Sequence, residues 1–241
     1  MSPLMPFGKF EHVFGPLSGK LVSFHWGDGN VGDRLIHAAT RQLFIQFGIS
    51  LSYENEEAIL YGGGGNMGNK YPNTRAVRAR LEKRAALLHV PLIILPQSWS
   101  GYDDTTFTKA FAREKGSLIY CPEAILAPDL ALGYVPKFKL PRATEDMGIC
   151  FRDDKERAVV PPKGNLGDPV RWLKSHGDYL WLAARYKHIH TDRLHFAICG
   201  LIAGRKVTLY PNSYHKNRAV WDAWLRDLGC HFCDDPSAAF L

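Results

Sequence analysis

Two segments in the second half of the chain carry side chains that could hold an anion. Arg152 ends one apolar run, and Arg193 stands where a helical pattern begins. Each planar guanidinium can form two parallel hydrogen bonds to a phosphate or a carboxylate. His195 follows two residues after Arg193 and can give or take a proton near neutral pH. Taken singly, these residues could be a surface arginine paired with Asp153 and a helix cap, but together they predict an anion site with an acid or base beside it.

Two glycine-rich segments in the first half of the chain could cradle a ligand. Each follows a strand-like run and leads into a helical pattern, the first over residues 26–33 and the second over residues 62–70. Such turns, at the carboxyl ends of parallel strands, bind anionic or polyhydroxyl ligands in α/β proteins. The alternatives are a helix cap at Asp33 and a close approach of packed chains at the glycines. The residues predicted to contact a ligand here are Asn30, Asp33, Gly63, Gly64 and Gly65.

The second glycine-rich segment is similar to two nucleotide-binding motifs but satisfies neither. Gly63, Gly65 and Gly68 match the pattern G-x-G-x-x-G. A dinucleotide site also needs a ribose-binding carboxylate at the end of a second strand, and Glu82 falls inside a helical pattern instead. The Walker A pattern fails because Tyr71 stands where the magnesium-binding hydroxyl would be.

The elements that must position these residues alternate between strand and helix. Strands are predicted at residues 20–25, 58–61, 91–95, 117–120, 147–151 and 206–210, and helices at residues 33–47, 74–89, 104–114, 170–184, 194–204 and 218–228. This alternation predicts an α/β fold with parallel sheets. A segment rich in basic residues and proline at 133–143 resembles a linker. We therefore predict two domains, residues 1–138 and residues 139–241.

Composition narrows the class of protein. The chain has 241 residues, of which 46% are hydrophobic and 22% charged, and this excludes a disordered chain. The apolar windows at 85–96 and 194–204 are shorter than the ~20 residues of a bilayer span. Residues 1–10 lack the pattern of a secretory signal. We expect a cytoplasmic protein with at most peripheral contact with the inner face of the membrane.

The net charge and the cysteine content do little to select a function. The net charge of +6 is compatible with an anionic substrate, an anionic surface or no specific charged partner, and it does not choose among them. Basic residues at 74–88 spread around the helix axis without interleaved aromatic residues, which argues against nucleic-acid binding. Five cysteines do not indicate a disulfide framework. Cys230 and Cys233 form a lone C-x-x-C pair, for which a metal or redox role and reduced thiols are the alternatives.

The order of several short motifs resembles the polysaccharide pyruvyl transferase family. The similarity covers roughly residues 21–228, and its most specific part is the Arg193-Leu194-His195 element. The motifs are Asn30-x-Gly32-Asp33, Gly62 to Gly65, Leu95-Pro96-Gln97-Ser98, Pro128-Asp129-Leu130-Ala131, Arg152, Thr191 to His195, and Lys216. The segment Tyr210 to Asn217 is similar to the bacterial exopolysaccharide branch. The resemblance implies two Rossmann-like domains in a GT-B-like arrangement, with a cleft between them.

The resemblance also implies an activity, the transfer of pyruvate from phosphoenolpyruvate to two hydroxyls of a sugar as a cyclic ketal. Phosphoenolpyruvate carries a phosphate and a carboxylate, for which Arg152 and Arg193 would be the two cationic partners. His195 would protonate the vinyl carbon as general acid. Further substrate contacts are implied for Leu194, Gln97, Ser98 and Lys216, besides Asn30, Asp33, Gly63, Gly64 and Gly65. The acceptor would be a glycan, free or lipid-linked, and the scheme calls for no cofactor and no metal.

Two other functions compete with this interpretation. A GT-B-like glycosyltransferase would use a nucleotide sugar, but a ribose-binding carboxylate does not stand out late in the chain. A non-catalytic glycan-binding module would need aromatic platforms. The candidates are Trp172, Trp181, Trp221 and Trp224, whose spacing fits amphipathic core helices better.

Overall fold

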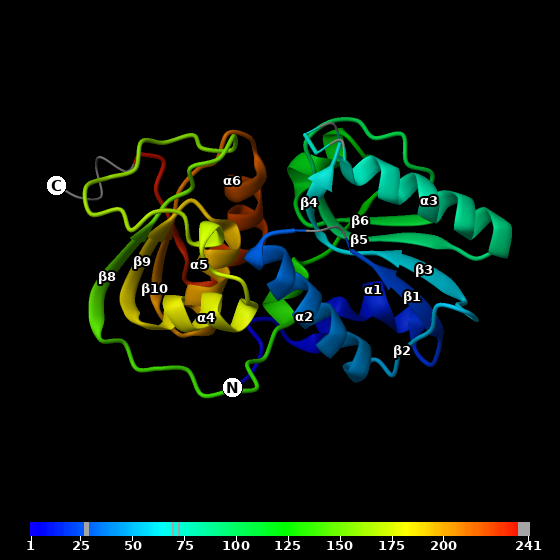
Figure 1. Cartoon of the computed structure of the whole chain (residues 1–241), viewed down its shortest axis with the longest axis horizontal. Coiled ribbons are helices and arrows are strands. Elements are labelled where there is room, and N and C mark those ends of the chain that lie inside the picture. The colour runs from blue at the N-terminus through cyan, green and yellow to red at the C-terminus, as the bar shows by residue number, and fades with distance from the viewer. Residues whose placement is uncertain (27–28, 69, 72, 236–241) are drawn as a thin grey trace. The chain divides into compact units, whose positions relative to one another are not determined.

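The structure is a computed structural model that describes residues 1–26, 29–68, 70–71 and 73–235 (Figure 1). Gly27, Asp28 and Asn69, which belong to the two glycine-rich segments, lie outside the described residues. The chain divides into two compact units. The N-terminal unit comprises Met5–Asp28 and Ile36–Gly133, and the C-terminal unit comprises Met1–Leu4, Gly29–Leu35 and Tyr134–Leu241. Each unit contains one parallel sheet, which confirms the predicted α/β class.

The sheet of the N-terminal unit reverses its strand order at β1. Its strands run in the order β2 (Ser50–Leu51), β1 (Leu21–His25), β3 (Ala58–Tyr61), β5 (Leu92–Trp99), β6 (Lys109–Ala112) and β7 (Ile125–Leu126), and β4 (Gly64–Met67) pairs with β5 beyond the end of β3. Every residue of β3 and β5 is buried, as expected of a parallel sheet covered on both faces. The carboxyl ends of β1 and β3 therefore flank a topological switch point, where open α/β sheets bind ligands.

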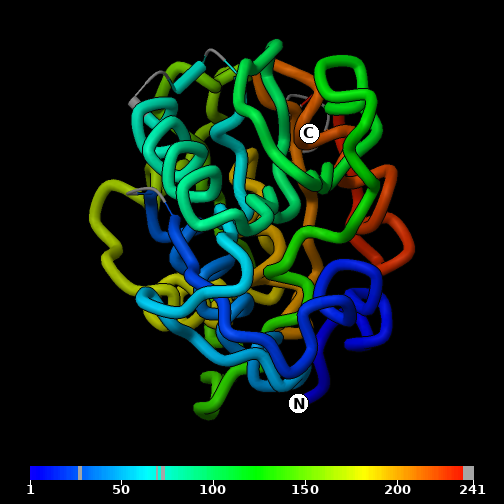
Figure 2. The backbone as a smooth tube through the Cα atoms, turned by 90° about the vertical axis from the view of Figure 1, so that its right-hand side faces the viewer, coloured from blue at the N-terminus to red at the C-terminus, as the bar shows by residue number. Residues whose placement is uncertain are grey.

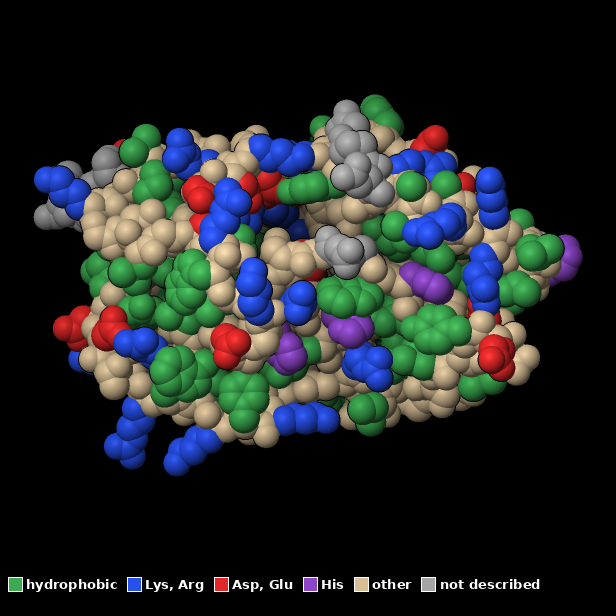
Figure 3. Space-filling model, in the orientation of Figure 1, with side chains coloured by type: hydrophobic (Ala, Val, Ile, Leu, Met, Phe, Trp, Pro, Cys, Tyr) green, Lys and Arg blue, Asp and Glu red, His purple; other side chains and the backbone are tan. Residues whose placement is uncertain are grey.

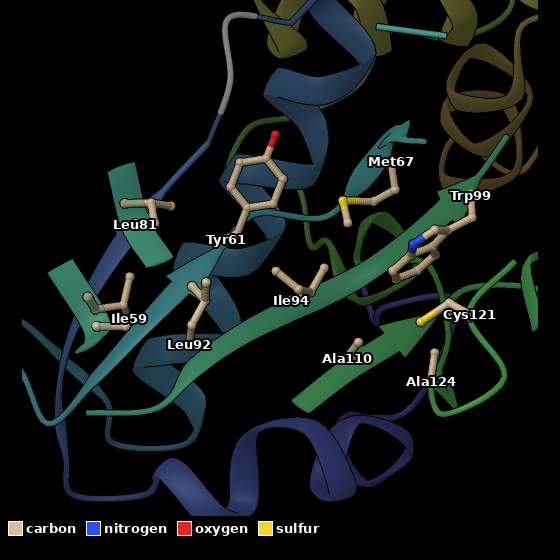
Figure 4. Packing of buried hydrophobic residues seen from close by; sticks show 12 residues of the cluster. Ile59, Tyr61, Met67, Leu81, Leu92, Ile94, Trp99, Ala110, Cys121 and Ala124 are labelled. Carbon is tan, nitrogen blue, oxygen red and sulfur yellow. The ribbon is translucent and has the colours of Figure 1, made fainter. Parts of the chain in front are cut away.

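The helices of the N-terminal unit complete its core. They are η1 (Phe7–Phe10), α1 (Glu11–Phe14), η2 (Gly15–Leu17), α2 (Val31–Gln46), α3 (Asn73–Leu88), η3 (Lys115–Ile119) and η4 (Leu130–Gly133). The first residues of α2 count with the C-terminal unit. Figure 4 shows Tyr61, Ile94 and Trp99 in a core cluster to which α3 adds Leu81. Since Glu82 lies inside α3, the strand-end carboxylate of a dinucleotide site is not found there.

The sheet of the C-terminal unit follows chain order, so that each strand pairs with the one before it. The strands are β8 (Glu145–Cys150), β9 (Tyr186–Thr191), β10 (Lys206–Leu209) and β11 (His231–Phe232). The helices are η5 (Pro169–Arg171), α4 (His176–Ala184), α5 (Leu194–Ile202), α6 (Lys216–Val220), the π-helical η6 (Trp221–Leu225) and η7 (Arg226–Leu228). Figure 1 shows α4 and α5 side by side in front of β9 and β10. Gly200 of α5 comes so close that a Cβ would lie 2.7 Å from Ile189 and Val207.

Most predicted elements are present, but two predictions are wrong. The predicted helix at 104–114 contains β6, and the predicted strand at 117–120 is the 3-10 helix η3. The residues flanking β6 are polar enough to suggest an amphipathic helix, but Phe111 is fully buried in the sheet and pairing with β5 and β7 overrides the local pattern. Strand β9 was not predicted, because lysine and two histidines interrupt its apolar pattern.

The connection from β8 to α4 is a long loop rich in proline and glycine. Apart from η5 it contains no helix or strand, and Figure 2 shows it as the yellow-green segment. Its side chains Asp154, Glu156 and Asp168 reach back to the carboxyl ends of β8 and β9. Within the described residues, no helix is long and apolar enough to cross a membrane.

Candidate anion-binding site

Three predicted substrate-binding cations meet at one end of the C-terminal sheet. Arg152 directly follows β8, Arg193 follows β9 by two residues, and Lys216 begins α6. Strands β8 and β9 are neighbours whose ends are in register, and the backbone N–H of Arg152 donates to Oδ1 of Asp192 at 2.8 Å. We call Arg152, Arg193 and Lys216 the cation cluster. Figure 3 shows acidic and basic side chains gathered in the region where Figure 1 labels α5 and α6.

The guanidinium of Arg193 is already held by carboxylates. Its Nε donates to Oδ1 of Asp168 at 2.9 Å, and its Nη2 donates to the other oxygen of Asp168 and, at 2.7 Å, to Asp154. Burial alone would lower the pKa of Arg193, but Asp168 outweighs it and the pKa is raised. The two-pronged edge that the sequence assigned to a substrate is therefore occupied by Asp168. Its Nη1 makes no hydrogen bond to the described residues, and the side chain is 7% exposed.

Arg152 and Lys216 share a second buried carboxylate. Nη1 of Arg152 and Nζ of Lys216 both donate to Oε2 of Glu156, the latter at 2.5 Å. Glu156 is almost completely buried. Glu156 and Asp168 were not predicted as partners, because nothing in the sequence indicated that Arg152 and Arg193 would be buried. Buried cations require such carboxylate partners.

A fourth carboxyl group, that of Asp192, lies in a buried environment that favours its protonated form. Its side chain is fully buried, and Oδ2 has no hydrogen-bond partner among the described residues. Burial raises the pKa of Asp192 to about 6, against the opposing effect of the Arg152 N–H. The cation cluster carries three positive charges and faces the four carboxyl groups of Asp154, Glu156, Asp168 and Asp192. Protonation of Asp192 therefore makes the whole group neutral.

The predicted general acid His195 lies in the first turn of α5 and is half-buried. The first turn of α2, which belongs to the same unit, packs against it: a Cβ on Gly32 would lie 2.7 Å from Nδ1 of His195. The N-terminus of α2 is held by reciprocal capping. Gly32 N–H donates to Oδ1 of Asn30 at 2.8 Å, and Asn30 N–H donates to Oδ2 of Asp33 at 2.9 Å. The capping alternative for Asp33 is thus confirmed, and ligand contact by Asn30 and Asp33 stays a prediction.

Three other predicted contact residues have buried side chains. Leu194 is buried at the start of α5. Gln97 donates to the carbonyl of Gly62 and accepts from the N–H of Asn66 at 3.3 Å. Ser98 accepts from Nε of Arg113 at 2.7 Å. Gln97 and Ser98 are fully buried, and their hydrogen bonds connect segments inside the N-terminal unit. The structure therefore does not place either side chain at a surface.

The glycine run after β3 approaches protein atoms closely. A Cβ on Gly62 would lie 2.9 Å from Cβ of Trp26, and a Cβ on Gly63 would lie 2.9 Å from the carbonyl oxygen of Pro96. Gly64 has a φ of 149°, which side chains rarely adopt. Close packing of the chain therefore accounts for Gly62 and Gly63, and ligand contact by Gly63, Gly64 and Gly65 stays a prediction.

A pair of histidines lies on the face of the C-terminal sheet opposite α5. Nε2 of His188 is 2.9 Å from Oγ1 of Thr208, and Nδ1 of His190 is 2.9 Å from the hydroxyl of Tyr210. Burial lowers the pKa of both imidazoles, that of His190 to about 4. With His231 and Cys233 they line a cavity of about 480 Å³. In the part of the chain that the structure describes, no group of three or more His, Cys, Asp or Glu side chains could hold a metal ion, and all five cysteines are free.

Comparison with known proteins gives one family match. The model of the family described as polysaccharide pyruvyl transferase matches residues 30–214. A solved structure, the functionally uncharacterised protein KP1_0663 from Klebsiella pneumoniae subsp. pneumoniae NTUH-K2044, shares the fold at 22% identity and a TM-score of 0.74, covering 94% of this chain and 97% of that one. The glycotransferase of kitacinnamycin aligns at 9% identity and a TM-score of 0.43, over 93% of this chain and 87% of that one. No curated protein matches the chain in a sequence comparison.

Proposed function

Because the chain belongs to the polysaccharide pyruvyl transferase family, we propose that it transfers the pyruvyl group of phosphoenolpyruvate to two hydroxyls of a sugar, forming a cyclic ketal and releasing phosphate. Family membership makes the chain a transferase of polysaccharide modification, and the donor and the ketal are the parts proposed here. The acceptor is a glycan, free or lipid-linked. The proposal further includes a GT-B-like arrangement with a cleft and a cytoplasmic location with at most peripheral contact with the membrane.

The observation that carries the proposal is the buried cation cluster at the ends of β8 and β9. Phosphoenolpyruvate is a small, multiply charged anion, and buried cations held by carboxylates cannot move away from it or collapse onto each other. Nη1 of Arg193 and Nη2 of Arg152 make no hydrogen bond to the described residues, so each arginine keeps one NH2 group that can donate to the phosphate or the carboxylate. The arriving negative charge also favours protonation of Asp192.

The chemistry assigned to His195 follows from the electronic structure of the donor. The imidazolium of His195 gives a proton to the methylene carbon, and the adjacent carbon becomes electrophilic. One sugar hydroxyl adds to that carbon and loses its proton, which restores the imidazolium. Phosphate leaves with the electron pair of the carbon–oxygen bond. The second hydroxyl then adds to the same carbon, gives its proton to the released phosphate and closes the ketal.

Phosphate release from phosphoenolpyruvate, measured against a panel of glycans, tests this function. Release that depends on one glycan, with a new ketal methyl signal in the proton spectrum of the product, is the expected result. His195→Gln keeps the size and a hydrogen-bond donor, so phosphoenolpyruvate should still bind while the rate falls by about 10² to 10⁴. Transfer from a nucleotide sugar without any use of phosphoenolpyruvate would identify a glycosyltransferase instead. Lost binding with a preserved chemical step would make His195 a ligand for the substrate.

A further inference from the structure

Trp26, which immediately follows β1, presents an indole that is 37% exposed. The ring is rigidly held from one side. It stacks on His37 of α2 with ring centroids 4.3 Å apart and 11° between the planes, and His37 stacks in turn on Phe24 at 5.3 Å and 7°. Two nearly parallel rings, those of His37 and Phe24, therefore support one face of the indole. No second ring among the described residues covers Trp26.

The glycine run after β3 makes room for this indole. Gly62 N–H donates to the carbonyl of His25 at 2.7 Å, which sets Gly62 beside Trp26. A Cβ on Gly62 would lie 2.9 Å from Cβ of Trp26 and 3.3 Å from the ring of Phe24. The first glycine of the run is thus explained by Trp26, which follows the neighbouring strand β1. Both residues lie at the switch point of the sheet, where open α/β folds bind ligands.

An indole face that is fixed and open to water suits one class of ligand in particular. A pyranose ring has an apolar face of C–H bonds, whose slightly positive hydrogens match the negative π face of the indole. The hydroxyls at the rim of the sugar stay hydrated while the apolar faces exclude water. We propose that the exposed indole face of Trp26 is the platform for a pyranose ring of the acceptor glycan. That the sugar is an acceptor rests on the proposed function, whereas its stacking on Trp26 does not.

Two of the tryptophans weighed as glycan platforms, Trp172 and Trp181, have no stacked ring among the described residues. Trp181 is 47% exposed and carries the guanidinium of Arg185 at 5.5 Å from its ring centre. Trp172 is 51% exposed and has no stacked ring among the described residues. They therefore serve as controls, because both indoles are exposed and neither has a ring stacked beneath it among the described residues.

Binding of simple sugars tests the platform without any use of phosphoenolpyruvate. The chain has six tryptophans, and the indole N–H signal that disappears from the ¹H–¹⁵N spectrum of Trp26→Phe identifies Trp26. Methyl glycosides of glucose, galactose and mannose are then titrated into the intact protein. We expect at least one of them to shift the Trp26 signal saturably while the Trp172 and Trp181 signals stay in place. No selective shift with any of the three, or a shift with uridine or adenosine alone, overturns the proposal.

Kinetics with the glycan that supports turnover extend the test. Trp26→Ala should raise KM for the glycan about five- to thirtyfold, which corresponds to about 1 to 2 kcal/mol, and leave KM for phosphoenolpyruvate unchanged. Trp26→Phe should restore most of the affinity. Gly62→Ala should act like Trp26→Ala, because the added methyl displaces the indole, and Trp181→Ala should leave both constants unchanged. An unchanged glycan KM in Trp26→Ala refutes the platform. Selective sugar shifts without turnover of phosphoenolpyruvate would overturn the proposed function and leave the platform standing.

Discussion

Gly32→Ala is the sharpest test of where the chemistry occurs, because it adds one methyl group next to His195. The methyl carbon would lie 2.7 Å from Nδ1 and 2.9 Å from Cβ of His195. Optimal carbon contacts are ~3.5 Å or longer, so the imidazole has to move by roughly 0.8 Å. A misplacement of about 1 Å can cost 10²-fold in rate, and we expect kcat to fall about ten- to a hundredfold.

The same substitution should leave the fold intact. Alanine is favoured over glycine inside a helix by about 0.5 to 1 kcal/mol, which offsets part of the strain from the new contact. We therefore expect the unfolding midpoint to stay within about 3 °C of the wild type. Gly8→Ala is the matched control, since no atom lies within 4 Å of a Cβ at that position.

The assay is phosphate release from phosphoenolpyruvate with a saturating acceptor, alongside calorimetric binding of phosphoenolpyruvate and a thermal scan. A fall in kcat at normal thermal stability, in Gly32→Ala and not in Gly8→Ala, supports the assigned place of His195. Wild-type kcat in Gly32→Ala would refute the argument, because the imidazole could then move without consequence.

Three further predictions concern stability, acid sensitivity and backbone conformation. Arg193→Lys keeps the charge but cannot reproduce the two-pronged contact with Asp168. Urea unfolding should show that the free energy of unfolding falls by about 1.5 to 3 kcal/mol for each charge-assisted hydrogen bond lost, and turnover should be impaired. A variant as stable and as active as the wild type would contradict this. Burial raises the pKa of Asp192 to about 6, so between pH 6 and the lower pKa of Asp192 in the unfolded chain the folded state binds more protons, and the free energy of unfolding rises as pH falls. The pKa of His190 is lowered to about 4, so His190 has the opposite effect over this range. Each residue changes the free energy of unfolding by an amount on the order of 3 kcal/mol. Asp192→Asn should therefore lose stability more steeply than the wild type between pH 6 and pH 4, and His190→Gln less steeply, as urea titrations at both pH values would show; parallel profiles would be inconsistent with the buried positions of these groups. Gly64→Val should abolish activity or folding, because a β-branched residue resists a φ of 149°, and circular dichroism with the phosphate assay would expose a variant that behaves normally.

The sequence predicted the parallel α/β class, because that class depends on repeated local patterns. Arg152 and Arg193 were assigned to one anion site from their residue types, since strand β9, which brings Arg193 beside β8, was not predicted. Alternating apolar runs and helices imply parallel strands, and the carboxyl ends of neighbouring parallel strands lie at one edge of a sheet. The same logic explains the error at β6. The short apolar run of β6 becomes a strand because it pairs with β5 and β7, and a local sequence pattern carries no information about these partners.

The partners of the charged residues depend on contacts between residues far apart in the chain. Asp168 and Arg193 are 25 residues apart, and Glu156 and Lys216 are 60 apart. Neither pairing has a fixed spacing that a motif could reveal. The support of Trp26 is also hidden in the sequence, because its stack on His37 depends on how α2 packs over β1.

Strict chain order in the C-terminal sheet has a consequence for how the protein is made. Among the described residues, strand β8 pairs with β9 alone and β10 follows β9, so each strand finds its partner in the strand synthesised next. Pairing between successive strands allows assembly to proceed during synthesis, in one direction along the chain. Arg152 leaves the ribosome first, gains the Asp192 contact when β9 docks, and shares Glu156 with Lys216 only once α6 exists. A nascent chain arrested before α6 should therefore hold Glu156 against a single cation, and the anion site is among the last features of this unit to mature.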